Sequence, residues 1–127
     1  MADVNRGHRP LSPHVSIYRW PLNAILSIAH RITGVGMAIS AILVVWWFLA
    51  AAVSPEAFAT ANGVLTSWLG YLVLIVSAAA LWFHFCNGIR HLVWDTGSWL
   101  GNRRVQQTGV AALIVAAVLT ILTIIIA

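Results

Sequence analysis

The sequence predicts an all-α membrane protein with three transmembrane helices. Hydrophobic residues make up 61% of the 127 residues and charged residues only 8%, a composition that excludes ordinary soluble domains. Three stretches contain no charged residue: between Arg31 and Glu56, between Glu56 and Arg90, and after Arg104. Each stretch is longer than the ~20 residues that an α-helix needs to cross a bilayer.

The charges predict the orientation of the chain. All seven basic residues are arginines, and they lie before or at the start of the first span or around the connection between the second and third. The first connection carries only Glu56. By the positive-inside rule, the N-terminus is expected in the cytoplasm and the C-terminus in the periplasm. The net charge of +4 therefore reflects topology, and no nucleic acid is expected as a partner.

The elements are expected in the following order. Residues 1–20 hold two prolines and scattered polar groups, so a cytoplasmic surface arm is expected there. A removable signal peptide is not expected, because this hydrophilic stretch comes before the first apolar segment. Residues 21–127 are expected to form one transmembrane domain, and Pro21 suits its first helical turn. Residues 54–63 and 96–104 are expected to be short outer and inner connections. The helices are predicted over residues 21–53, 64–95 and 105–126.

The third predicted helix carries a stripe of small residues. Its members recur at helical spacing on one side: Gly109, Ala112, Ala116, Thr120 and Thr123. Small side chains let helix backbones approach closely in a membrane. The stripe is therefore interpreted as a packing seam with no chemical role.

Residues 84–95 hold a polar cluster at the end of the second predicted helix. His84, Gly88, His91 and Asp95 share one helical face, which favours a partner or cofactor over lipid. His84 is expected ~16 Å from the cytoplasmic end of the helix, near the middle of the membrane. A histidine at that depth is either hydrogen-bonded across helices or functional, as a haem or metal ligand or a proton relay.

Among these ligands, haem fits His84 best. No second Cys, His or carboxylate lies within a turn on the same face, which disfavours zinc. The sequence has no C-x-x-C-H, so a haem would be held non-covalently, as haem b. His91 lies ~10 Å further along the helix and cannot bind the same iron. His30 is expected nearer the surface than His84, so a second ligand from another subunit is favoured.

A second polar cluster opens the first predicted helix. Ser27, His30, Arg31 and Gly34 share one face, and they are expected beside the inner membrane surface. A hydroxyl, an imidazole and a guanidinium there could bind haem propionates or the carbonyl oxygen of a quinone. Ser27 alone could equally bond to its own helix backbone. Trp20 could add an apolar wall on this face, or serve only as an interfacial anchor.

Two arginines at membrane depth require compensation. Burying Arg31 or Arg90 costs ~3 kcal/mol, or less near the interface, and the cytoplasmic half of the helices offers only the carboxylate of Asp95. Haem propionates or acids of a partner are expected to supply the missing anions. For Arg90, snorkelling or pairing at the membrane edge is the alternative. No nucleophile with a general base is evident, so the chain alone is expected to catalyse nothing.

Two long motifs resemble the cytochrome b subunit of succinate dehydrogenase, the b556-type membrane anchor of respiratory complex II. The first is RPL at 9–11 with SIAHRIT at 27–33, and the second is HFCNGIRHLVWDTG at 84–97. The resemblance covers essentially the whole chain. It implies a helical bundle formed with a second anchor subunit, in the bacterial inner membrane.

The resemblance also implies roles for individual residues. His84 matches the axial ligand of haem b, and the opposite ligand would be a histidine of the second anchor subunit. The positions in the vicinity of the haem are His30, Arg31 and His91. The positions of the quinone site are Trp20, Ser27, Ile28 and Arg31.

The function implied by the resemblance is electron transfer to ubiquinone within the lipid bilayer. Electrons would come from a flavoprotein subunit with FAD through an iron–sulfur subunit. Three alternatives stay open: an anchor of a fumarate reductase, a structural anchor without haem, and a small transporter or proton-conducting subunit. The last would use His84, His91 and Asp95 as a relay.

Overall fold

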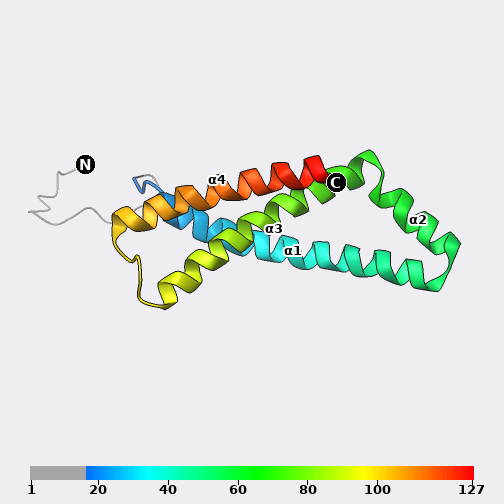
Figure 1. The fold of residues 1–127 in the computed structure, drawn as a ribbon, viewed down its shortest axis with the longest axis horizontal. Coiled ribbons are helices and arrows are strands. Elements are labelled where there is room, and N and C mark those ends of the chain that lie inside the picture. The colour runs from blue at the N-terminus through cyan, green and yellow to red at the C-terminus, as the bar shows by residue number, and fades with distance from the viewer. Residues whose placement is uncertain (1–16) are drawn as a thin grey trace, which may run out of the picture.

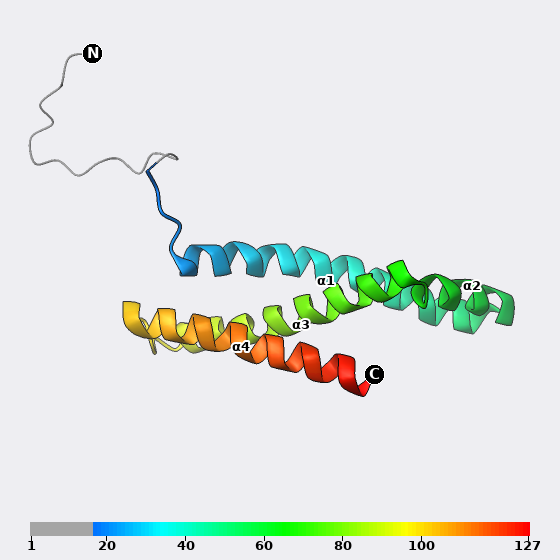
Figure 2. The same cartoon turned by 90° about the horizontal axis from the view of Figure 1, so that it is seen from above.

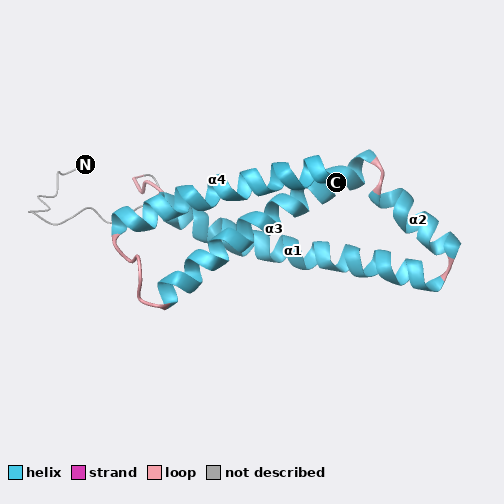
Figure 3. Cartoon of the chain, in the orientation of Figure 1, coloured by secondary structure: helices cyan, strands magenta, loops and turns pink. Residues whose placement is uncertain are grey.

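The computed structural model describes residues 17–127, and this part of the chain is helical without any strand (Figures 1 and 3). Residues 1–16, most of the expected arm, lie outside the described residues, and residues 17–20 are not helical. The helices are α1 (Leu22–Val53), α2 (Pro55–Leu65), α3 (Trp68–Asp95) and α4 (Asn102–Ile126). Three of them, α1, α3 and α4, are long and apolar enough to cross a membrane. The prediction of an all-α protein with three spans is confirmed.

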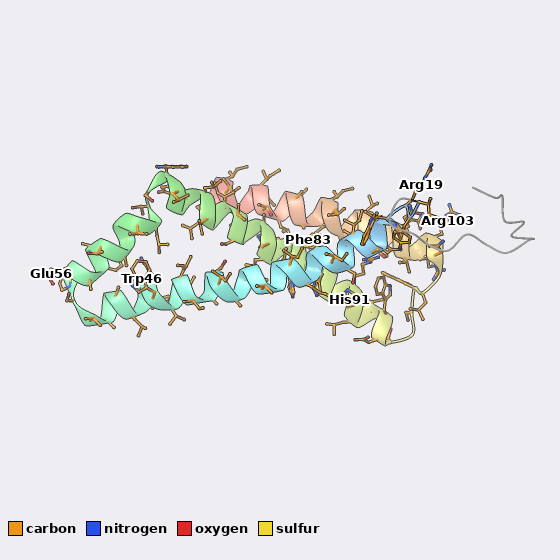
Figure 4. The ribbon with its side chains drawn as sticks, turned by 180° about the vertical axis from the view of Figure 1, so that it is seen from behind. Arg19, Trp46, Glu56, Phe83, His91 and Arg103 are labelled. Atoms are coloured by element: carbon orange, nitrogen blue, oxygen red, sulfur yellow. The ribbon has the colours of Figure 1, made fainter. Side chains whose placement is uncertain are left out.

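Helix α3 is the central element of the bundle. It makes the most extensive contacts of any helix, with α4 on one side and α1 on the other. In Figure 1 it runs obliquely across α1 and beside α4, and Figure 2 shows it between them. The arginines Arg19 and Arg103 lie at one end of the bundle and Glu56 at the other (Figure 4). This separation is the one that the positive-inside argument requires, while the compartment that each end faces stays a prediction.

The outer connection differs from the expectation, because residues 55–65 form a helix of their own. Ser54 caps α2, accepting a hydrogen bond from the backbone N–H of Ala57 at 3.1 Å, and Pro55 and Glu56 occupy its first turn. Each of these residues favours a helix start. As a result α3 begins at Trp68, not near Val64. Helix α4 begins at Asn102, three residues before the expected start.

A close turn joins α2 to α3. The Ser67 hydroxyl accepts a hydrogen bond from the backbone N–H of Gly70 at 3.1 Å and so caps α3. Gly70 is buried, and a Cβ at this position would collide with the carbonyl oxygens of Val64 and Leu65. The turn therefore requires a residue without a side chain at position 70.

Small residues and polar bridges hold the three long helices together. Gly109, Ala112 and Ala116 of α4 are buried, which confirms this part of the predicted packing seam. The Ser40 and Ser77 hydroxyls lie 2.8 Å apart between α1 and α3. In α3, Trp82 Nε1 donates to the hydroxyl of Thr123 in α4 at 2.8 Å. Such contacts drive helix association in lipid, where burial of apolar surface does not.

Substitution of Gly109 by alanine is expected to loosen the bundle. The added Cβ would lie 2.7 Å from Leu26 Cδ1 and 3.3 Å from Arg90 Nη2, and such overpacking costs about 1–3 kcal/mol. Denaturant unfolding of the purified protein in detergent measures the loss. Gly36→Ala is the matched control, since a Cβ there meets nothing within 4 Å. Equal stability of the two variants would contradict the close packing of α4.

Candidate functional site

Three histidines meet where α1 and α3 cross. The rings of His30 and His84 are stacked, with centroids 3.8 Å apart and planes at 16°. The ring of His91 lies 5.2 Å from that of His30 and is tilted by 40°. All three side chains are half-buried, and Figure 4 shows His91 near the crossing of the two helices. The helices cross and bring the rings of His30 and His84 face to face, while the expectation that His30 lies nearer the membrane surface stays a prediction.

The backbone of α1 fixes the protonation pattern of the His84 ring. His84 Nδ1 donates a hydrogen bond to the His30 carbonyl oxygen at 3.0 Å. A carbonyl oxygen can only accept, so Nδ1 must carry the hydrogen. In the neutral ring Nε2 therefore keeps its lone pair. The structure thus presents Nε2 of His84 as a potential metal ligand.

The ring of His30 has a polar atom without a partner. Among the described residues, His30 Nδ1 and Trp94 Nε1 are the buried side-chain nitrogens that have no hydrogen-bond partner. Nearly all buried polar atoms in proteins are hydrogen-bonded. His30 Nδ1 is therefore an exception, enclosed by this chain and yet without a hydrogen-bond partner among the described residues.

The remaining predicted site residues lie on or before the first turns of α1. Ser27 is half-buried, whereas Ile28 and Arg31 are exposed. Trp20 precedes the helix, because α1 begins at Leu22, so it does not continue the helical face of Ser27 as expected. It is 60% exposed, and its ring packs edge-on against Tyr18 at 5.4 Å. The structure thus places an exposed guanidinium and exposed apolar side chains near one end of α1.

Arg90 is buried, with only 6% of its surface exposed, and it joins three helices. Its Nη2 donates to Asn23 Oδ1 in α1 at 2.8 Å and to the Val105 carbonyl oxygen in α4 at 2.7 Å. Its Nε donates to the Thr108 hydroxyl in α4 at 3.1 Å. Its Nη1 donates to Asn87 Oδ1 at 3.3 Å.

The surroundings of Arg90 differ from the alternative of snorkelling or pairing at the membrane edge. Within residues 17–127 the guanidinium bonds to neutral oxygens and to no carboxylate, and its carbon lies 4.1 Å from the centre of the Trp94 ring. The Arg90 side chain is buried between the helices, whereas Asp95 is exposed at the last residue of α3. Sequence reasoning missed Asn23 and Asn87, although an amide inside an apolar helix is itself a signal of a buried polar contact.

Comparison with known proteins places these features in a family context. Residues 5–123 match the sequence model of the succinate dehydrogenase/fumarate reductase transmembrane subunit. The succinate dehydrogenase cytochrome b556 subunit of Paracoccus denitrificans is 48% identical over 126 residues, covering 99% of this chain and 97% of that protein. The corresponding protein of Rickettsia bellii is 36% identical over 114 residues, covering 90% and 89%. The mitochondrial succinate dehydrogenase cytochrome b560 subunit of Sus scrofa is 38% identical over 112 residues, covering 84% and 64%.

Proposed function

Because the chain belongs to the family of succinate dehydrogenase and fumarate reductase transmembrane subunits, we propose that it is the haem b-binding anchor of a succinate:quinone oxidoreductase. It is a multi-pass protein of the bacterial inner membrane. In the proposed role it holds a flavoprotein with FAD and an iron–sulfur subunit at the membrane. Electrons pass from these partners to ubiquinone beside this chain. The named relatives are succinate dehydrogenase subunits, so succinate oxidation is the proposed direction.

The observation that carries the haem assignment is the hydrogen bond of His84. The His30 carbonyl oxygen accepts from Nδ1 at 3.0 Å, and histidines that bind metals almost always donate their other ring nitrogen in this way. Nε2 is left free to bind the iron. When bound, the haem would supply a one-electron carrier.

The second axial ligand is proposed to come from the other anchor subunit. A haem b held by two histidine side chains would need room between them. The rings of His30 and His84 are nearly parallel with centroids 3.8 Å apart, which leaves no space for a macrocycle between them. His30 therefore serves, with Arg31 and His91, as a neighbour of the haem.

Arg31 is proposed to bind the quinone together with Ser27, with Trp20 and Ile28 as the apolar wall. Its guanidinium is exposed and permanently charged, so it can polarise a quinone carbonyl and stabilise developing negative charge. The same property prevents it from supplying the proton, which must come from a partner or water. The exposure of Arg31, Ile28 and Trp20 on this chain is consistent with a site that a partner subunit completes.

Substitution of Arg31 by alanine tests the quinone site. We expect quinone reduction by the whole complex to fall by about 10²-fold, the effect of removing one donor to a developing oxyanion. Succinate oxidation with an artificial dye should stay at the wild-type rate, because it does not need the quinone site. Arg103→Ala, another exposed arginine at the same end of the bundle, is the control and should retain both activities. Equal loss of both activities in Arg31→Ala would point to failed assembly, whereas quinone reduction at the wild-type rate would contradict the proposed role.

A further inference from the structure

We propose that Thr33 is a positioning residue for His84. Its hydroxyl holds Nδ1 of the imidazole ring, while the other nitrogen, Nε2, binds the iron. This inference rests on the proposed haem function. It assigns to a side chain of α1 a part in setting the reduction potential of the haem.

The hydrogen-bond directions around Thr33 support this role. Its hydroxyl oxygen lies 2.9 Å from the carbonyl oxygens of both Ala29 and His30, so the single hydroxyl hydrogen is directed to these carbonyls. The same oxygen lies 3.3 Å from His84 Nδ1. Since Nδ1 carries a hydrogen and the hydroxyl hydrogen is already used, the Thr33 oxygen accepts from Nδ1. The N–H of His84 is thus shared between the His30 carbonyl and the Thr33 hydroxyl.

The adjacent backbone of α1 confines the same edge of the ring. A Cβ built on Gly34 would lie 3.1 Å from His84 Cε1, so this edge occupies the space that the missing side chain leaves. One face of the ring is covered by His30 at 3.8 Å. Contacts on one face and one edge fix the direction in which Nε2 points.

Hydrogen bonds from a ligating histidine change the properties of the metal. An acceptor on the N–H increases the basicity of the other nitrogen. A more basic ligand stabilises the ferric form over the ferrous form and lowers the reduction potential. The carbonyl of His30 cannot be removed by substitution, which leaves the Thr33 hydroxyl as the adjustable part of this contact.

The test is a potentiometric titration of the haem in the whole purified complex. Thr33→Val keeps the shape of the side chain and removes the hydroxyl, so the midpoint potential should become more positive. The ratio of reduced to oxidised haem at a fixed potential should rise between about threefold and tenfold, where tenfold corresponds to about 59 mV for one electron. Thr33→Ser should restore the wild-type potential.

Thr120→Val is the matched control. Thr120 also bonds to its own helix, at 2.8 Å from the Ala116 carbonyl oxygen, but it has no contact with His84. This variant should titrate as the wild type does. If the midpoint potential of Thr120→Val shifted by the same amount, the loss of any threonine hydroxyl bonded to its own helix would be enough to change the potential. That result would overturn the inference.

The remaining outcomes also decide the question. A wild-type potential in Thr33→Val overturns the inference, as does a shift that Thr33→Ser fails to reverse. If Thr33→Val retains no haem, full haem content in Thr33→Ser supports the role of the hydroxyl, and its loss there overturns it. A wild-type complex that contains no haem would instead overturn the proposed function, before any variant is compared.

Discussion

Substitution of His84 by leucine is expected to remove haem b from the assembled complex. The substitution deletes the only nitrogen in this chain that is proposed to bind the iron, and leaves the apolar surroundings of α3 intact. Removing only the hydrogen-bond partner of a metal ligand lowers the affinity for the metal by about 10–100-fold. Removing the ligand itself should lower the affinity for haem by at least as much. The haem content per flavoprotein subunit, determined from the absorption spectrum of the purified complex, measures the effect.

His30→Leu provides the comparison for this experiment. The backbone carbonyl that accepts from His84 Nδ1 remains in that variant, so the spectrum of a haem with two histidine ligands should persist. If the two substitutions abolish that spectrum alike, the second ligand comes from this chain and not from a partner. An unchanged spectrum in His84→Leu would show that His84 is not a ligand.

Substitution of Arg90 by methionine is expected to have the largest effect on stability. The guanidinium donates to side-chain or backbone oxygens in α1, α3 and α4. Methionine would remove the donor to the side-chain oxygens of Asn23, Asn87 and Thr108, while the Val105 carbonyl would keep the Thr108 hydroxyl as a donor. Each unsatisfied buried group costs about 1–3 kcal/mol, so the total should reach about 3 kcal/mol or more. Arg90→Lys should recover only part of this loss, because an ammonium group cannot reproduce the planar fork of the guanidinium.

Denaturant unfolding of the complex in detergent measures these losses. Arg104→Met removes an exposed arginine from α4, and a surface substitution of this kind should change stability by no more than about 0.5 kcal/mol. If Arg90→Met were no more harmful than Arg104→Met, the hydrogen bonds of Arg90 would not be what joins the three helices.

The fold was largely predictable from the sequence, because the bilayer sets the length of a span and charged residues mark its ends. The small residues at 109, 112 and 116 predicted the buried side of α4 for a similar local reason. Helix α2 was missed although Ser54, Pro55 and Glu56 carry a helix-start signal, since a segment between two spans was taken to be a loop. Local signals of this kind do not depend on neighbouring helices.

The site was predictable only where it depended on one helix at a time. His84 was selected from its depth along α3 and its helical face. The stacking of the His30 and His84 rings could not be predicted, because it depends on where α1 and α3 cross. The partners of Arg90 lie on α1 and α4 as well as on α3, so their identity depends on how the helices are aligned, which no single helix encodes.

The hydrogen bonds of Arg90 also bear on the order in which the chain can assemble during synthesis. Two of its partners, Val105 and Thr108, are translated after it. When α3 first leaves the ribosome, its guanidinium can reach Asn23 and Asn87 but lacks the oxygens of α4. The Ser40–Ser77 contact requires only α1 and α3, so it can form earlier. The set of hydrogen bonds around Arg90 can therefore be complete only after α4 has been synthesised.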